Sequence, residues 1–543
     1  MKNYTNSLVL FKNLHRVIKQ CHSNVTRNIS SDNSRNGWKC SVGLEIHAQL
    51  MTKSKLFSSA PYEYGAGTNT QVNLFDAAIP GTLPVLNKSA VEMAVLSALA
   101  LGCNINETSF FDRKHYFYPD MPAGYQITQQ RVPLAENGAV EFAIYQPGVH
   151  AKPYYKIARI KQIQLEQDSG KSLHDSEGNS SFVDLNRAGV ALIEIIFKPD
   201  LHHEDEAVGL IKEIIQILKR VQTCSGKMEE GALRVDANVS VSEDDKLGVR
   251  TEIKNISSIH GVANAIKAER ERQIDLIKAG EEVKNETFMW DSVGKKVIQM
   301  RDKEDNQDYR FMPEPNLPPL RLIIRDSLED IHKNAKSRGG VFDLRHLKSR
   351  VPSTPQQDRM NLVKEYGLSE VFAFTLVNQE KLLSYFKDIM AENSSRNPKT
   401  TYLILMVQLL HVLNLNNLEI ENCKIAASHL GQIVDLIQKR RISKKTVEFL
   451  LKELVKDSNT LTPVELVEKN NLEIISNPRE LRKFCLRVVE KEVVMVATYK
   501  KRKKSVLNEL INKVIIETKY RADTQVLPQI MTEVLNEKLE NEI

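Results

Sequence analysis

Apolar and polar residues alternate strictly along residues 43–50, whose sequence is GLEIHAQL. The apolar set is Leu44, Ile46, Ala48 and Leu50, and the polar set is Glu45, His47 and Gln49. Because successive side chains of a strand point to opposite faces, the pattern predicts a half-buried β-strand with a carboxylate, an imidazole and an amide on one face. A solvated sheet face alternates in the same way, so this strand alone does not distinguish a wet surface from a reaction site.

Four later runs repeat the pattern and predict further strands. They are QIQLEQD at 162–168, ALIEIIF at 191–197, LRVDANVSV at 233–241 and VRTEIKN at 249–255. Glu194 is the one polar residue of its run, and a carboxylate is costly to bury unless it is paired or bound to a metal. Adjacent strands joined by short turns favour an antiparallel sheet with helices, an α+β fold, over regular βαβ winding.

The chain changes character twice after this region, which predicts three domains. Residues 37–325 hold the predicted strands, and the proline-rich stretch at 312–320 must be extended and is interpreted as the exit from that domain. Residues 326–423 show a mostly helical pattern. Residues 424–543 contain no glycine after Gly431 and repeat apolar residues at three- and four-residue spacing, which is typical of a small helical bundle.

Composition limits the class of protein. Hydrophobic residues make up 41% of the 543, which is enough for real cores. No apolar run reaches the roughly 18 residues of a membrane span, so we expect no membrane insertion. The six cysteines are scattered without a CxxC pair, which argues against a disulfide framework or a zinc knuckle and suits a reducing compartment.

The N-terminal segment is basic and poor in acids. Residues 1–35 carry six lysines and arginines against Asp32 alone, while the net charge of the whole chain is +6. The segment is also rich in Ser and Asn and places apolar residues at roughly helical spacing. This composition predicts a mitochondrial (or plastid) transit peptide over residues 1–36, and in the mitochondrial case a location in the matrix; a disordered tail is the alternative.

The polar faces of the predicted strands supply five carboxylates and one imidazole. They are Glu45, His47, Glu166, Glu194, Asp236 and Glu252. Carboxylates that converge on one sheet repel each other, and they are tolerated where a hard cation such as Mg²⁺ lies between them, usually with phosphate oxygens completing its shell. If the strands are neighbours, we therefore expect a Mg²⁺ site, although one imidazole also suits Mn²⁺ and does not exclude zinc.

A phosphate ligand needs cations and backbone donors. The candidates lie in FDRKHYFYPD, DSGKS and DLNRAG, and they are Arg113, Lys114, Lys171 and Arg187. DSGKS is not a Walker A loop, since that motif requires a glycine at the position of Leu165, and no GxGxxG opens a βαβ unit. Nucleotide binding would therefore belong to a less common fold.

Nine motifs between residues 41 and 320 together resemble one family. They are GLEIHAQL, TKSKLFS, PGTLPVLNK, FDRKHYFYPDMPAGYQI, LEQDSGKSLHD, DLNRAGVALIEI, KMEEGALRVDANVSV, TEIKN and DYRFMPEP. In length and order they resemble the signatures of the B subunits of aspartyl/glutamyl-tRNA amidotransferases, and the basic N-terminus resembles that of the mitochondrial members.

The resemblance implies an activity, a fold and partners. A mischarged Glu-tRNA(Gln) would be bound, its glutamyl side chain phosphorylated by ATP with Mg²⁺, and the phosphate displaced by ammonia to give Gln-tRNA(Gln). The ammonia would come from glutamine hydrolysed by the A subunit, and the C subunit would complete a heterotrimer, so the complex would be a carbon–nitrogen ligase with glutamine as amido-nitrogen donor. The implied fold is α+β: a glutamine-synthetase-like antiparallel-sheet cradle, the catalytic domain, followed by an all-α helical domain and a small all-α tail domain.

The resemblance also implies roles for individual residues. Those in the metal and acyl-phosphate site would be Glu45, His47, Glu194, Asp236 and Glu252, with Lys114 as a phosphate contact. Many members read Glu-Glu-Asp where this chain has Glu166, Gln167 and Asp168, and alternation favours Glu166 as the ligand. In the tail, the candidate contacts to the tRNA backbone are Lys500, Lys501, Arg502, Lys503 and Lys504, although a charge run alone is most often a solvated surface.

Two other functions stay open from the sequence. A non-catalytic tRNA-binding scaffold of the same complex would keep the fold, but it has no reason to retain a set of buried carboxylates. A small-molecule ATP-dependent amide ligase would use the same site, but it has no need of the helical appendage and the basic tail.

Overall fold

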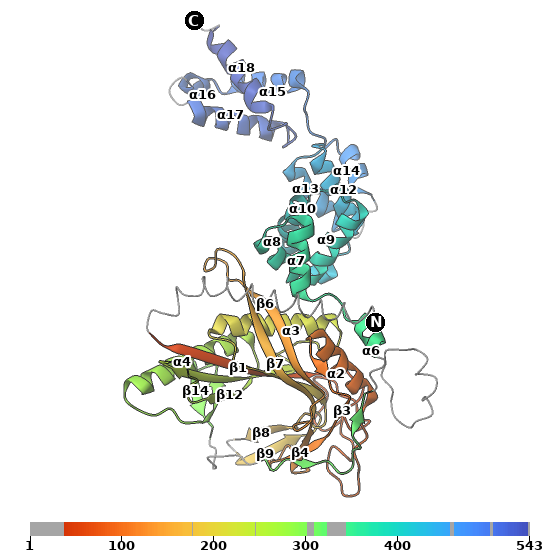
Figure 1. The fold of residues 1–543 in the computed structure, drawn as a ribbon. Coiled ribbons are helices and arrows are strands. Elements are labelled where there is room, and N and C mark those ends of the chain that lie inside the picture. The colour runs from red at the N-terminus through yellow and green to blue at the C-terminus, as the bar shows by residue number, and fades with distance from the viewer. Residues whose placement is uncertain are drawn as a thin grey trace, which may run out of the picture. The chain divides into compact units, whose positions relative to one another are not determined.

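The structure is a computed structural model that describes residues 37–175, 178–244, 246–300, 309–322, 344–456, 461–499 and 503–540. The chain divides after residue 356 into two compact units (Figure 1). The predicted transit peptide, residues 1–36, lies outside the described residues.

The first unit is built on a nine-stranded sheet. In spatial order its strands are β14 (Lys296–Gln299), β13 (Thr287–Asp291), β12 (Thr251–Ile256), β11 (Leu233–Ser242), β1 (Lys39–Gln49), β10 (Ala191–Phe197), β7 (Tyr154–Gln167), β6 (Ala135–Ile144) and β2 (Asn104–Ile105). Neighbouring strands are antiparallel except for β12 and β13, which are parallel. The antiparallel α+β fold that the sequence predicts is therefore confirmed.

One face of this sheet is covered by helices and forms the core. The helices are α2 (Lys88–Ala100), α3 (Glu204–Arg220) and α4 (Ile259–Lys278). The apolar positions of β1 that alternation assigns to the core, Leu44, Ile46 and Ala48, are fully buried there. Helix α3 begins with three acids and ends with Lys219 and Arg220, which complement its dipole at both ends.

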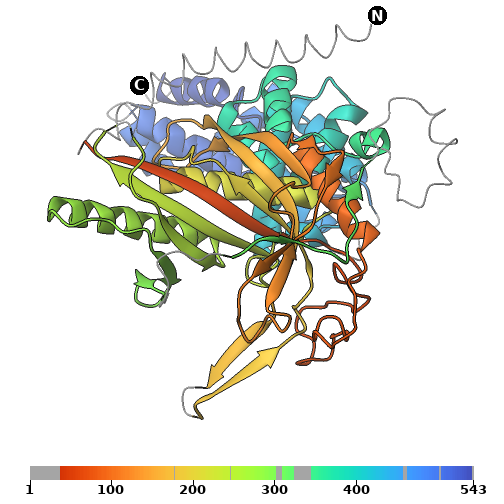
Figure 2. The same ribbon diagram turned by 60° about the horizontal axis from the view of Figure 1, so that its bottom comes forward.

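A smaller sheet of β15 (Met312–Pro313), β4 (Asp112–His115) and β5 (Tyr125–Thr128) packs on the large sheet through β5 and β7. Two further sheets have two strands each: β16 (Leu320–Arg321) with β3 (Thr108–Ser109), and β8 (Lys171–Asp175) with β9 (Ser180–Asp184). Figure 2 shows the hairpin β8–β9, in yellow-orange, projecting away from the large sheet. The proline-rich stretch at 312–320, predicted to be extended, is strand at its two ends but turns at residues 315–317. The two ends pair with β4 and β3, which ties the stretch into this domain.

Helix α6 (Leu344–Ser349) packs on α2 in the first unit, and the second unit consists of helices. They are α7 (Pro355–Tyr366), α8 (Glu370–Val377), α9 (Glu380–Glu392), α10 (Pro398–Leu403), the π-helix Ile404–Leu409, α11 (Leu410–Leu415), the 3₁₀-helix Ile420–Asn422, α12 (Ala427–Gln438), α13 (Lys444–Leu454), α14 (Pro463–Lys469), α15 (Pro478–Lys491), α16 (Val493–Thr498), α17 (Lys503–Glu517) and α18 (Leu527–Glu540).

Two hydrophobic cores lie in this helical unit. One is formed by buried residues between Leu362 and Val467, and the other by buried residues between Ile475 and Leu535. The first core runs across residue 423, where the sequence predicts a domain boundary; the division into domains stays a prediction. Within the part of the chain that the structure describes, no helix combines the length and the apolar character needed to cross a membrane.

Candidate active site

Five neighbouring strands of the large sheet bring the predicted polar faces together. Strand β1 lies at their centre, with Glu45 opposite Asp236 of β11 and His47 opposite Glu194 of β10. In β12, Glu252 lies opposite Asn238 of β11. Because residues paired across antiparallel strands share a face, these groups converge on the side of the sheet that the helices leave open.

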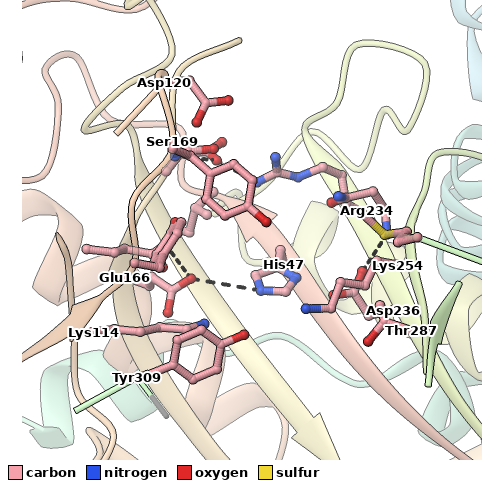
Figure 3. A pocket seen from close by; sticks show the side chains of 17 residues that line it. His47, Lys114, Asp120, Glu166, Ser169, Arg234, Asp236, Lys254, Thr287 and Tyr309 are labelled. Atoms are coloured by element: carbon pink, nitrogen blue, oxygen red, sulfur yellow. Dashed lines mark hydrogen bonds and ion pairs between the residues drawn. The ribbon is translucent and has the colours of Figure 1, made fainter. Parts of the chain in front are cut away.

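A cavity of about 280 Å³ lies over this face. The large sheet contributes His47, Glu166 and Asp236 to the lining of this cavity. The three-stranded sheet of β15, β4 and β5 contributes Lys114 and Gln126. Figure 3 shows His47 in the middle, with Glu166 on one side and Asp236 and Lys254 on the other. Tyr309 lies beside Lys114, whose Nζ is 4.8 Å from the centre of the tyrosine ring.

The most compact cluster in the site is His47, Glu166 and Glu194. One potential ligand atom from each of the three lies within 4.8 Å of the others. The Nε2 of His47 is 3.9 Å from Oε1 of Glu166 and 3.7 Å from Oε1 of Glu194. Among the described residues, the buried Oε2 of Glu166 has no hydrogen-bond partner. Two carboxylates, one of which has an oxygen without a hydrogen-bond partner, and one imidazole fit a hard cation such as Mg²⁺ or Mn²⁺.

Electrostatics in the cluster also favour added positive charge. Burial, together with the charge of Glu166, raises the pKa of Glu194 to about 8. Burial lowers the pKa of His47, but the charges of Glu194, Asp236 and Glu166 outweigh it and raise that pKa overall. The cluster therefore holds protons more tightly than free side chains do, and a metal ion would compete for the same lone pairs.

A second group of acids lies next to this cluster. Asn238 donates its Nδ2 to Oε1 of Glu45 at 3.0 Å, and the backbone N–H of Asn255 donates to Oδ1 of Asp236 at 2.7 Å. Burial raises the pKa of Glu252, whose Oε2 lies 3.7 Å from Nζ of Lys254. All six residues predicted as metal ligands thus lie on one face, although Glu45, Glu194 and Glu252 are not part of the cavity lining.

Within residues 166–168, only Glu166 belongs to the compact cluster, as the alternation of side chains along the strand predicts. Glu166 faces the cluster, whereas the buried side chain of Gln167 lies with its Nε2 4.0 Å from Sδ of Met121. Asp168 accepts hydrogen bonds from Nη2 of Arg234 at 2.8 Å and Nε2 of Gln49 at 3.3 Å. Gln167 is thus not part of the compact cluster, and Asp168 forms a buried ion pair.

Of the four predicted phosphate contacts, the structure brings only Lys114 into the cavity. Burial lowers its pKa, but the charges of Glu166 and Glu194 raise it overall, so the side chain is cationic. Arg113, the preceding residue, points the other way along β4, where its Nε and Nη2 lie 2.6 and 3.1 Å from the carboxylate of Glu314.

The other two predicted phosphate contacts also lie outside the cavity lining. Lys171 is exposed on the β8–β9 hairpin, opposite Asp184. Arg187 donates to the backbone oxygens of Ser169 and Gly170 at 3.0 and 2.6 Å, so it holds the turn that follows β7.

Several lining residues were missed from the sequence. Lys254 shares the polar face of Glu252, so alternation could have identified it as a cation of the site. Tyr309 and Gln126 come from segments that carry no such signal, since their positions depend on β15 and β5 packing over the large sheet.

The predicted basic run in the tail is only partly within the described residues. Lys503 and Lys504 open helix α17, and Lys500, Lys501 and Arg502 lie outside the described ranges. A role for this run in binding nucleic acid stays a prediction.

We expect the effect of Mg²⁺ on thermal stability to depend on pH. A raised pKa in the folded state stabilises the metal-free fold fully below the pKa of the unfolded glutamate, and this contribution is lost as pH rises through about 8. The melting temperature in EDTA should therefore fall between pH 6 and pH 9, and the gain on adding Mg²⁺ should be larger at pH 9. Equal Mg²⁺ effects at both pH values, or an unchanged pH profile in Glu194→Gln, would contradict the assignment.

Comparison with known families agrees with the motifs. A family model described as the GatB/GatE catalytic domain matches residues 40–327, and one described as the GatB domain matches residues 384–539.

Similar proteins match along nearly the whole chain. The mitochondrial B subunit of the glutamyl-tRNA(Gln) amidotransferase of Aedes aegypti is 45% identical over 90% of this chain and 91% of its own length. The human protein of the same name is 42% identical over 92% of this chain and 88% of its own length. The B subunit of the aspartyl/glutamyl-tRNA(Asn/Gln) amidotransferase of Orientia tsutsugamushi (strain Boryong) is 35% identical over 92% and 97%. These matches show that the chain belongs to the family of tRNA amidotransferase B subunits, in the mitochondrial form that the sequence predicts.

Proposed function

We propose that this chain activates and amidates the glutamyl group of mischarged Glu-tRNA(Gln), using ATP, Mg²⁺ and ammonia released from glutamine by a partner. The observation that carries the proposal is the cluster of His47, Glu166 and Glu194, with the free Oε2 of Glu166, beneath a cavity that also holds Lys114. Such a site can bind a metal–phosphate group and place a cation beside it.

The acidic residues and the lysines of the site would have different roles in this reaction. The set that would hold Mg²⁺ is Glu45, His47, Glu166, Glu194, Asp236 and Glu252. When bound, ATP and Mg²⁺ supply a phosphate leaving group in place of the oxide that a carboxylate would otherwise have to release. Lys114 and Lys254 flank the acids and would bind phosphate oxygens, and the two sheets around the cavity would hold the reacting groups in position and limit the entry of water.

The proposed partners follow from what this chain lacks and what its tail carries. Its sequence has no Ser- and Gly-rich amidase signature, so ammonia would come from the A subunit, with the C subunit completing a heterotrimer in the mitochondrial matrix. The basic run at 500–504 would contact the tRNA backbone. A scaffold without catalysis is disfavoured, because it would not require five acids, whose charges repel, on one sheet face.

The test is reconstitution of the complex. The full chain, co-expressed with the A and C subunits, should convert Glu-tRNA(Gln) to Gln-tRNA(Gln) in the presence of ATP, Mg²⁺ and glutamine, and ammonium chloride should replace glutamine. Omission of ATP or addition of EDTA should stop the reaction. If no Gln-tRNA(Gln) forms and no ATP is consumed, the proposal is wrong.

A further inference from the structure

Four acids of the site share one feature: each accepts a hydrogen bond from a neutral amide. Glu166 accepts from Nε2 of Gln126 at 2.7 Å, and Glu194 accepts from Nε2 of Gln164 at 2.5 Å. Glu45 and Asp236 accept from the side chain of Asn238 and the backbone of Asn255, as described above. A neutral donor fixes the direction of a carboxylate and satisfies one lone pair, but it leaves the negative charge available to a cation.

Other buried acids of the same unit are held differently. Asp168 is bound by Arg234, Asp112 by Arg131, and Glu314 by Arg113. An arginine neutralises the charge of its carboxylate, and Arg113 also occupies both oxygens of Glu314, which leaves little for a metal ion. These acids accept from neutral donors as well, as Asp168 does from Gln49, so the difference lies in the arginine. Among the described residues, none of the four amide-held acids of the site forms an ion pair with an arginine.

The amides are themselves fixed by second hydrogen bonds. Nε2 of Gln126 also donates to the backbone oxygen of Gln167 at 2.7 Å, and Nε2 of Gln164 also donates to Oγ1 of Thr128 at 3.1 Å. Oε1 of Gln164 accepts from Gln162 at 2.6 Å, so the nitrogen of its amide must face Glu194. The amide group of each of these two glutamines therefore has one orientation. In addition, Gln126 connects strand β5 of the small sheet to Glu166 on strand β7 of the large sheet.

We propose that Gln126 and Gln164 are positioning residues that set the metal affinity of the site through Glu166 and Glu194. This inference rests on the proposed function for the presence of a metal, and it adds which residues tune that metal. Because Gln126 holds Oε1 of Glu166, it fixes the orientation of the whole carboxylate beside His47, including the unpartnered Oε2. Loss of such a supporting hydrogen bond typically weakens metal binding about 10- to 100-fold.

The test compares three variants of the full chain in its complex. Gln126→Met and Gln164→Met remove an amide donor to an acid while keeping side-chain length. Gln129→Met is the matched control, because Gln129 is equally buried, donates to Oγ of Ser109 at 2.9 Å and accepts from the backbone of Leu165 at 3.0 Å. All three lose buried hydrogen bonds, so all three should lower thermal stability to a similar extent.

The inference is tested by the affinity of the complex for Mn²⁺, measured by electron paramagnetic resonance without ATP or tRNA. We expect about 10- to 100-fold weaker binding in Gln126→Met and Gln164→Met and little change in Gln129→Met. In the transamidation assay, the Mg²⁺ concentration at half-maximal rate should rise more than the rate at saturating Mg²⁺ falls. Equal Mn²⁺ affinity in the three variants, or no Mn²⁺ binding by the unmodified complex, overturns the inference. The proposed function has its own test, since it fails if the unmodified complex forms no Gln-tRNA(Gln).

Discussion

Asp236→Asn should lower the rate of ATP-dependent transamidation about 10²- to 10³-fold while tRNA binding and the glutaminase activity of the A subunit persist. The asparagine keeps an oxygen that can accept from the backbone N–H of Asn255, so the fold around the bulge in β12 is preserved. It removes the negative charge that a metal ion requires. A loss of several kcal/mol of metal-dependent stabilisation corresponds to a rate about 10²- to 10³-fold lower.

The measurements separate chemistry from binding. Formation of Gln-tRNA(Gln) and consumption of ATP report on the site, and a gel-shift assay reports on tRNA binding. Asp244→Asn is the matched control, because Asp244 is an exposed acid just beyond the end of the same strand. An Asp236→Asn complex that loses tRNA binding but keeps its specific activity would refute the metal-site assignment.

The sequence predicted the parts of the site that depend on local pattern. Alternation in β1, β10 and β11 put Glu45, His47, Glu194 and Asp236 on polar faces, and the structure has those strands with nearly the expected bounds. It could not show which strands are neighbours. Glu45 and Asp236 are far apart in the chain, and only the register of β1 with β11 places them opposite each other.

The different positions of the candidate phosphate-binding cations have a common physical cause. Arg113 and Lys114 are adjacent in a basic motif, and nothing local tells which one faces the cavity. The outcome depends on Glu314, whose carboxylate is 201 positions away in the chain and binds Arg113. Gln49, which alternation left without a role, donates to Asp168 across a separation of 119 positions. Long-range partners decide such cases, and a single sequence does not reveal them.

The buried ion pair of Asp168 and Arg234 leads to the largest predicted effect on stability. Asp168 is buried and is held by Arg234, by Gln49 and by the backbone N–H of Ser169 at 2.9 Å. Burial would raise the pKa of this carboxyl, but the charges of Arg234 and Arg187 outweigh it and lower that pKa. Its contribution to stability is thus present above the usual range of an aspartate and is lost as pH falls through the lowered value.

Asp168→Ala should lower the free energy of unfolding of the first unit by about 3–5 kcal/mol, because it leaves the half-buried guanidinium of Arg234 without its buried partner. Denaturant unfolding followed by tryptophan fluorescence measures this directly, since both tryptophans of the chain, Trp38 and Trp290, pack against the core of that unit. Glu230→Ala, which removes the partner of the exposed Lys227, should change little.

A double variant separates the cost of an unpaired charge from the loss of a contact. If the uncompensated guanidinium of Arg234 is what destabilises Asp168→Ala, removing that charge as well should recover part of the loss, because a buried ion pair replaced by apolar groups is often tolerated. Asp168→Ala combined with Arg234→Met should therefore be more stable than Asp168→Ala alone. A double variant that is less stable than the single one would show instead that the packing and hydrogen bonds of Arg234 matter more than its charge.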